Sequence, residues 1–75
     1  MINLTIGNSS KTERTIVDPN STVIQLCEEH QIDWSRAQVM VNGVTLTPGQ
    51  IEMSLAELGC KEVASIFVLD KLTNA

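Results

Sequence analysis

One segment of this chain, residues 21–31, reads as a full helix, and that single helix constrains what the rest can form. Thr22 and Gln25 fit a capping box, in which the hydroxyl accepts from an N–H of the first turn and the amide reaches back to the cap. An apolar face follows at three- and four-residue spacing: Val23, Leu26, Cys27 and His30. A helix of this length is marginal in water on its own. We therefore expect a small sheet to pack against that face.

The other elements are predicted to be short and extended. Strands are expected over residues 2–6, 11–17, 38–41, 44–46 and 65–69. Asn42-Gly43 lies between two apolar runs and predicts a two-residue type I′ hairpin, and residues 47–49 are expected to end that hairpin. In the second strand, periodicity does not decide which of its two faces is buried. Trp34 follows the helix and is predicted to be a lid over the core.

A second capping box, Ser54 and Glu57, predicts a single helical turn that Gly59 closes. The order is then strand, strand, helix, strand, short strand, helical turn, strand. This order indicates one α+β domain over residues 1–75, a β-grasp roll of the form ββαββ(short helix)β with a mixed sheet packed on one helix.

Composition narrows the classes of function. The net charge is −4 and the five Lys and Arg residues form no cluster, which argues against nucleic acid and against anionic membrane surfaces as partners. No apolar run approaches the roughly 20 residues that a membrane span needs. The first residues show no secretory signal, and two cysteines without such a signal favour reduced thiols. We expect a cytoplasmic protein.

Several segments, taken in order, resemble a ubiquitin-like protein. They are residues 11–12 after a polar turn, residues 17–23 into the helix, residues 39–43, residues 54–58 and residues 66–69. The resemblance covers nearly the whole chain and implies the ubiquitin-like β-grasp fold. The Asn42-Gly43 turn is also similar to that of the ThiS/MoaD-like sulphur carriers, which share this fold.

The covalent chemistry of those families depends on a C-terminal Gly-Gly, whose slim backbone threads an activating enzyme's channel. This sequence ends Leu72-Thr73-Asn74-Ala75, and the side chains of Thr73 and Asn74 would obstruct that passage. The expectation is a protein that acts without covalent attachment. The alternative is a diverged sulphur-carrier-like protein that serves as a subunit or scaffold of a small metabolic complex.

No constellation of residues points to catalysis, so we expect neither an enzyme nor a cofactor. Cys27 and His30 lie on neighbouring turns of one helix face, at a spacing compatible with two zinc ligands, but Cys60 is the only other soft ligand. A nucleophilic Cys–His pair would lack an orienting third group and an oxyanion loop. A Cys27–Cys60 disulfide would require both side chains to converge in the core. The preferred interpretation is a buried thiol and a partly exposed histidine, with no metal.

Apolar residues on both sides of two strands carry the functional hypothesis. If residues 39, 41, 66 and 68 face the helix, then Met40, Phe67 and Leu69 face away from it. The resemblance makes the two strands neighbours and places these three residues where the main binding patch of ubiquitin lies. Exposed contiguous apolar patches mark interfaces, and we expect a protein partner, with Lys11 and Lys71 as charges at the rim. A homodimer through this face, or cover by residues 70–75, remains as an alternative.

Overall fold

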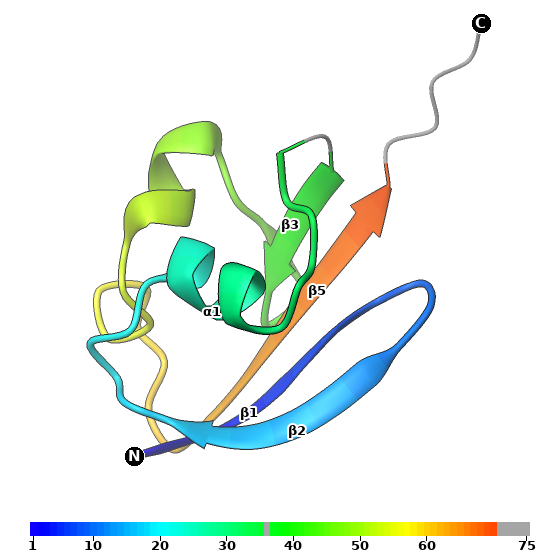
Figure 1. Ribbon diagram of the computed structural model, residues 1–75. Coiled ribbons are helices and arrows are strands. Elements are labelled where there is room, and N and C mark those ends of the chain that lie inside the picture. Colours follow the sequence, from blue (N-terminus) through cyan, green and yellow to red (C-terminus); the bar gives the residue numbers. More distant parts are fainter. Residues whose placement is uncertain (36, 71–75) are drawn as a thin grey trace, which may run out of the picture.

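The structure, a computed structural model, describes residues 1–35 and 37–70, with a single helix packed on one face of a mixed sheet (Figure 1). Lys71 and the rest of the tail lie outside the described residues. The elements in chain order are β1 (Ile2–Asn8), β2 (Thr12–Val17), α1 (Val23–Glu29), β3 (Ala37–Val41), β4 (Val44–Thr45), the 3₁₀ helix η1 (Pro48–Glu52) and β5 (Val63–Asp70). The predicted α+β architecture and its order of strands and helix are confirmed.

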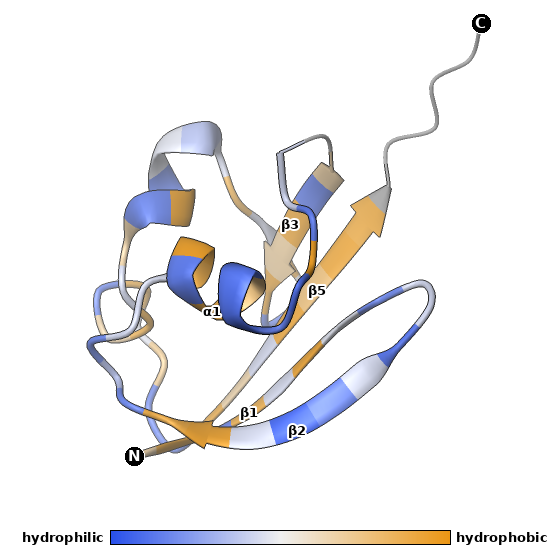
Figure 2. Cartoon of the chain, in the orientation of Figure 1, coloured by the Kyte–Doolittle hydropathy of each residue, from blue (hydrophilic) through white to orange (hydrophobic). Residues whose placement is uncertain are grey.

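The sheet has five strands in the order β2-β1-β5-β3-β4. β1 and β5 pair in parallel at the centre, whereas the β1–β2, β3–β5 and β3–β4 pairs are antiparallel. Two hairpins therefore form the outer parts of the sheet, and the first and last strands meet in the middle. Figure 2 shows apolar residues along these central strands.

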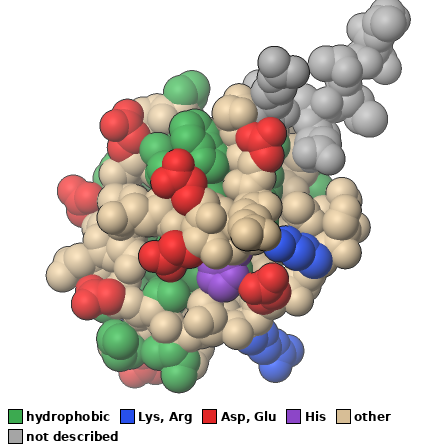
Figure 3. All heavy atoms as spheres, viewed as in Figure 1, with side chains coloured by type: hydrophobic (Ala, Val, Ile, Leu, Met, Phe, Trp, Pro, Cys, Tyr) green, Lys and Arg blue, Asp and Glu red, His purple; other side chains and the backbone are tan. Residues whose placement is uncertain are grey.

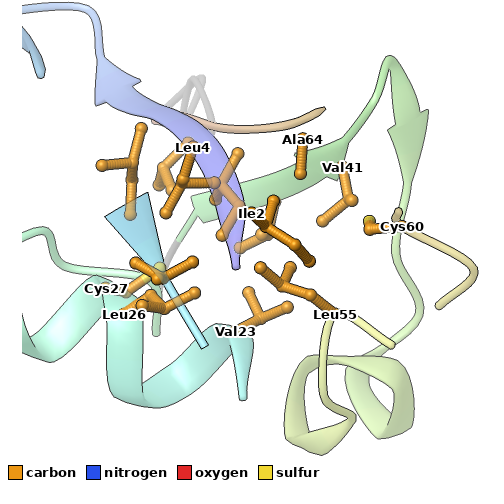
Figure 4. Close-up of a cluster of buried hydrophobic side chains, with 14 of the residues drawn as sticks. Ile2, Leu4, Val23, Leu26, Cys27, Val41, Leu55, Cys60 and Ala64 are labelled. Carbon is orange, nitrogen blue, oxygen red and sulfur yellow. The ribbon is translucent and has the colours of Figure 1, made fainter. Parts of the chain in front are cut away.

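Helix α1 begins as its sequence predicts. The Thr22 hydroxyl accepts from the Gln25 N–H at 3.2 Å, and the Gln25 side-chain oxygen accepts from the Thr22 N–H at 3.0 Å. Val23, Leu26 and Cys27 are buried against the sheet, as expected. Figure 4 shows these three side chains pointing towards β1 and β3. Each buried aliphatic side chain of this kind contributes about 1.5–3 kcal/mol to folding.

The sequence also placed the two tight turns correctly. Asn42 and Gly43 have φ values of 51° and 83°, as a type I′ turn requires. The Ser54–Glu57 capping box is present, with the Glu57 carboxylate accepting from the Ser54 N–H at 2.9 Å, and Gly59 follows with φ 86°. The turn after Ser54 buries Leu55 completely in the core.

Helix η1 is a difference from the sequence-based prediction, in which residues 47–49 only end a hairpin. Its signal was available: Thr47 and Gln50 have capping-box spacing, and Pro48 occupies the first turn, where its lack of an N–H costs nothing. In the structure the Gln50 side-chain oxygen accepts from the Thr47 N–H at 2.8 Å. Pairing with β1 also settles the face of β2, because Val17 is buried on the helix side while Ile16 and Arg14 are exposed.

Candidate protein-binding face

The face of the sheet away from α1 is built by the strand registers. Met40 on β3 lies directly opposite Phe67 on β5, and Gln38 lies opposite Leu69. Because side chains alternate along a strand, these four residues share one face, and Leu69 is diagonal to Met40. The structure thus brings Met40, Phe67 and Leu69 together, as the sequence predicts. We call these three residues the outer patch.

The outer patch is accessible to solvent. Phe67 is 38% exposed and Leu69 is 36% exposed, whereas Ile66 and Val68, their neighbours on β5, are each 1% exposed. Met40, on the same face as Phe67 and Leu69, is half-buried. The contrast along a single strand shows that the helix covers one face of β5 and leaves the other open.

Around the patch the described side chains are polar but uncharged. Gln38 donates through its side-chain nitrogen to the Thr45 hydroxyl at 2.8 Å, which fixes the polar border along β4. On β1 and β2 the residues of the same row are Gly7 and Thr12. Among the described outward-facing strand residues, Arg14 is the one that carries a charge. The overall acidity of the chain is therefore concentrated elsewhere, and Figure 3 shows acidic side chains scattered over the helix side.

The structure does not place Lys11 at the rim of the outer patch. Its ammonium donates to the backbone oxygen of His30 at the end of α1, at 2.7 Å, and lies 3.6 Å from the Glu13 carboxylate. Both contacts are on the helix side of the sheet. The reason is tertiary, since the loop from β1 to β2 brings Lys11 near the carboxyl end of α1. Lys71, the other expected rim charge, lies outside the described residues.

Cys27, His30 and Cys60 do not form a common site. His30 Nδ1 contacts a Glu13 carboxylate oxygen at 2.7 Å, while Cys27 points into the core beneath the helix. Cys60 lies at the other end of the core, where its sulfur accepts from the Asn42 side-chain nitrogen at 3.6 Å. Both cysteines are free thiols, and residues 1–35 and 37–70 contain no group of three residues able to hold a metal ion.

Burial disfavours the thiolate form of both cysteines. Desolvation, with a smaller contribution from the Glu28 carboxylate, raises the pKa of the Cys27 thiol to about 11. Desolvation also raises the pKa of Cys60, and the hydrogen bond from Asn42 opposes that rise. Because the thiolate is the nucleophilic form, a raised pKa disfavours nucleophilic chemistry at either residue.

A cavity that the sequence did not reveal lies on the helix side, beyond the short strand β4. It has a volume of about 460 Å³, and its apolar lining comes from Trp34, Ala37, Val39, Leu46, Pro48 and Ile51. Trp34 is partly buried and packs against the core, in agreement with its predicted position as a lid. Its walls come from the segment before β3, from β3 itself and from the chain that runs from β4 to η1.

Solved structures share this architecture. The ubiquitin-like domain of an Arabidopsis thaliana protein superposes with a TM-score of 0.70 at 26% identity, over 99% of this chain and 82% of that one. A ubiquitin-like protein from the hyperthermophilic archaeon Caldiarchaeum subterraneum superposes with a TM-score of 0.57 at 15% identity, over 97% of this chain and 100% of that one. The chain has a ubiquitin-like β-grasp fold. No protein-family model matches the sequence, and no curated protein matches it.

Ubiquitin-like domains are generally protein-interaction modules and not enzymes, and the fold indicates no more than this about function. The resemblance drawn from the sequence is thereby confirmed for the fold. Within residues 1–35 and 37–70, no helix is long and apolar enough to cross a membrane.

Proposed function

We propose that this ubiquitin-like domain is a non-covalent protein-binding module and that the outer patch is its contact surface. The observation that carries the proposal is the exposure of Phe67 and Leu69 beside Met40, on a sheet face that no described helix covers. Phe and Met are enriched in the buried centres of interfaces. Their exposure leaves apolar surface in water that a partner would remove.

The border of the patch indicates the chemistry of the partner. Its described residues are polar and uncharged, with Gln38 and Thr45 already bonded to each other. A complementary surface would present apolar side chains to the patch, and uncharged donors and acceptors around them. A strongly charged contact would lose hydration here without finding an opposite charge.

The sulphur-carrier-like alternative makes a different demand, since it would use the segment after β5. That segment lies outside the described residues, and nothing in the described part favours a metabolic scaffold over a binding module. We further propose that the domain is not an enzyme and acts in the cytoplasm. The buried, high-pKa thiol of Cys27 supports the first of these statements.

The test compares two pairs of charge substitutions. Met40→Glu with Leu69→Glu places two carboxylates on the outer patch, and Val44→Glu with Val63→Glu places two on exposed apolar residues outside it. Affinity capture followed by quantitative mass spectrometry should find proteins held by wild type and by the control pair and lost by the patch pair. Each candidate is then confirmed by titration with purified protein.

Folding and self-association must be measured on the same variants. We expect the free energy of unfolding of the patch pair in urea to lie within about 1 kcal/mol of wild type, because neither side chain belongs to the buried core. Light scattering over a range of concentrations reports whether the patch mediates a homodimer. Unchanged capture of every protein by the patch pair would overturn the proposal, and unfolding of that pair would show that the two faces of the sheet have been confused.

A further inference from the structure

Strand β2 forms the long open edge of the sheet. It has six residues, whereas β4 at the opposite edge has two. The Asn8 N–H donates to the Lys11 carbonyl at 2.8 Å, which makes this pair hydrogen-bonded. Hydrogen-bonded and non-hydrogen-bonded pairs alternate along an antiparallel ladder, so Glu13, Thr15 and Val17 direct their backbone groups to β1. Arg14 and Ile16 then direct their N–H and C=O groups outwards, towards a position where no described strand lies.

The outward side chains of this edge form a self-complementary series. On β2, Arg14 is positive and Ile16 is apolar and 62% exposed. Asp18, which follows the end of the strand directly after Val17, is negative and exposed, and continuing the alternation of β2 would put it in the same row. When such a series pairs antiparallel with itself about Ile16, each arginine comes opposite an aspartate. Exposed edge strands are templates for pairing with another chain, and here the side chains favour an identical chain.

Other registers are less favourable. Outward-facing side chains of one copy must lie opposite outward-facing side chains of the other. The two-fold axis must therefore pass through a residue and not between two residues. Centring on Arg14 would place two guanidinium groups opposite each other, and centring on Thr15 would place Ile16 opposite an arginine. Centring on Ile16 places the two isoleucines together and, on the helix side, Thr15 opposite a valine, which is a favourable β-branched pair. The backbone ladder ends at this point, because the Asp18 carbonyl already accepts from the Ser21 N–H at 3.0 Å and Pro19 has no N–H.

The surface next to this edge is hollow, with both polar and apolar residues in its lining. A depression of about 380 Å³ on the outer face is lined by residues of β1, β2 and the start of β5, including Ile16, Arg14 and Val63. Ile16 and Val63 lie in one row across the sheet, on either side of Asn3. A second isoleucine beside Ile16 would cover one wall of this depression and remove apolar area from water.

We propose that β2 pairs with β2 of a second copy of this chain, antiparallel about a two-fold axis at Ile16, with Arg14 of each copy opposite Asp18 of the other. The product is one continuous sheet made of two five-stranded halves. Because the axis is perpendicular to the sheet, both helices lie on one side and both outer patches on the other. The inference does not depend on the proposed function, but it would present two patches to a bivalent partner and raise its avidity.

One short strand pair buries a small area, and interfaces below about 1,200 Å² in total are typically weak. The association is therefore measured by sedimentation equilibrium from micromolar to millimolar concentrations. Wild type should shift from monomer to dimer over this range. Arg14→Asp should weaken the dimer at least tenfold, because two like-charge contacts replace two ion pairs. Combining Arg14→Asp with Asp18→Arg should restore the dimer.

Asp18 has a second role, which needs its own control. Its carboxylate accepts from the Asn20 N–H at 2.8 Å and shapes the turn into α1. Asp18→Asn keeps that acceptor and removes the charge, so it tests the ion pair if the arginine variant does not fold. A double-mutant cycle compares Arg14→Gln, Asp18→Asn and the two combined. Each single substitution already removes the ion pair, so the double variant should associate no more weakly than either single variant.

A cross-linking experiment tests the register directly. Residues facing each other in a hydrogen-bonded antiparallel pair have Cα atoms about 5.5 Å apart, which suits a disulfide. Ile16→Cys should therefore yield a disulfide-linked dimer under mild oxidation. Thr12→Cys is exposed on the same strand, but in this register the two copies of residue 12 would be about 25 Å apart. It should give little cross-linked product.

The outer-patch pair Met40→Glu and Leu69→Glu separates this proposal from the previous one, because it should leave the β2 dimer intact. Monomer at every concentration with no Ile16→Cys cross-link would overturn the dimer. Loss of association in the outer-patch pair, with Arg14→Asp still dimeric, would assign self-association to the patch. A charge swap that folds but does not restore association would overturn the register.

Discussion

Strand β5 carries large apolar side chains on both of its faces, but the two faces have different neighbours. On β5, Ile66 and Val68 face α1 and are fully buried, whereas Phe67 and Leu69 face the other way and stay partly exposed. α1 and the turn at Leu55 cover the first face (Figure 4). The described residues provide no such cover for the second.

The apolar residues on the two faces therefore differ in how far folding alone removes them from water. Those on the helix side stabilise the fold, because folding itself removes them from water. Phe67 and Leu69 on the outer face remain 38% and 36% exposed after folding, and association would remove more of that apolar area from water.

The largest difference is expected between adjacent residues of β5. Ile66→Ala should lower the free energy of unfolding by about 2–5 kcal/mol, because it leaves a cavity in a closely packed core. Phe67→Thr should lower it by less than about 1 kcal/mol, since threonine suits a strand and the site is open to water. Urea unfolding of the two variants beside wild type measures both values. Equal losses would mean that the outer face is also part of the core.

The outer face has one position that should not tolerate a side chain. A Cβ atom on Gly7 would lie 2.5 Å from the Lys11 carbonyl oxygen, a backbone atom that cannot move without opening the hairpin. Gly7→Ala should therefore cost about 1–3 kcal/mol, in the range of overpacked sites. Thr5→Ala, on the same face of β1, serves as the control and should cost less. Both are measured by thermal unfolding.

Burial of the Cys27 thiol on the helix side should make the stability of the fold depend on pH in the alkaline range. Burial raises the pKa of the Cys27 thiol from 9.0 to about 11, so the folded state retains a proton that the unfolded state releases. The stability that this thiol contributes is complete below pH 9 and is lost as the pH rises towards 11, by roughly 2 kcal/mol at pH 11. Cys27→Ala should lose less stability between pH 8 and pH 11 than wild type does. Parallel pH profiles would place the thiol in contact with water.

The smallest effect is expected at the border of the helix side, where Glu13 joins β2 to α1. The hydrogen bond with the His30 ring, followed by the nearby charge of Lys11, holds the pKa of the Glu13 carboxyl below 4.5. A carboxyl whose pKa is lower in the folded state stabilises the fold at pH values above its unfolded-state pKa. This stabilisation is lost as the pH falls through its folded-state pKa. Glu13→Gln should therefore reduce the unfolding midpoint slightly at pH 7 and not at pH 3. Because the pair is exposed, salt should also diminish the difference.

Local hydrogen bonds explain which parts of the fold could be predicted. The Thr22 cap, the Asn42-Gly43 turn and the Ser54 cap each bond within a few residues, so the sequence contains their whole explanation. The face of β2 could not be predicted, because both of its faces mix polar and apolar residues and only pairing with β1 decides. Helix η1 has a local signal of the same kind in Thr47 and Gln50, which have capping-box spacing.

The candidate site was predictable to the same extent. Alternation along the two strands directs Met40, Phe67 and Leu69 away from the helix, and the resemblance to ubiquitin-like proteins makes the strands neighbours, which the register confirms. The direction of Lys11 was not predictable, since its partner is the carbonyl of His30, nineteen residues away in the chain. The cavity beside Trp34 was equally hidden, because its walls come from the segment before β3 and from η1.

The central place of β5 affects how the domain is made on the ribosome. β5 is the last strand to be synthesised, yet it alone joins β1 to β3. At typical rates of translation, β1 and β2 precede it by several seconds, roughly. During that interval the hairpin and α1 have no partner for most of their apolar face. We therefore expect folding to start only after β5 leaves the exit tunnel, and nascent chains shorter than this to be substrates for chaperones.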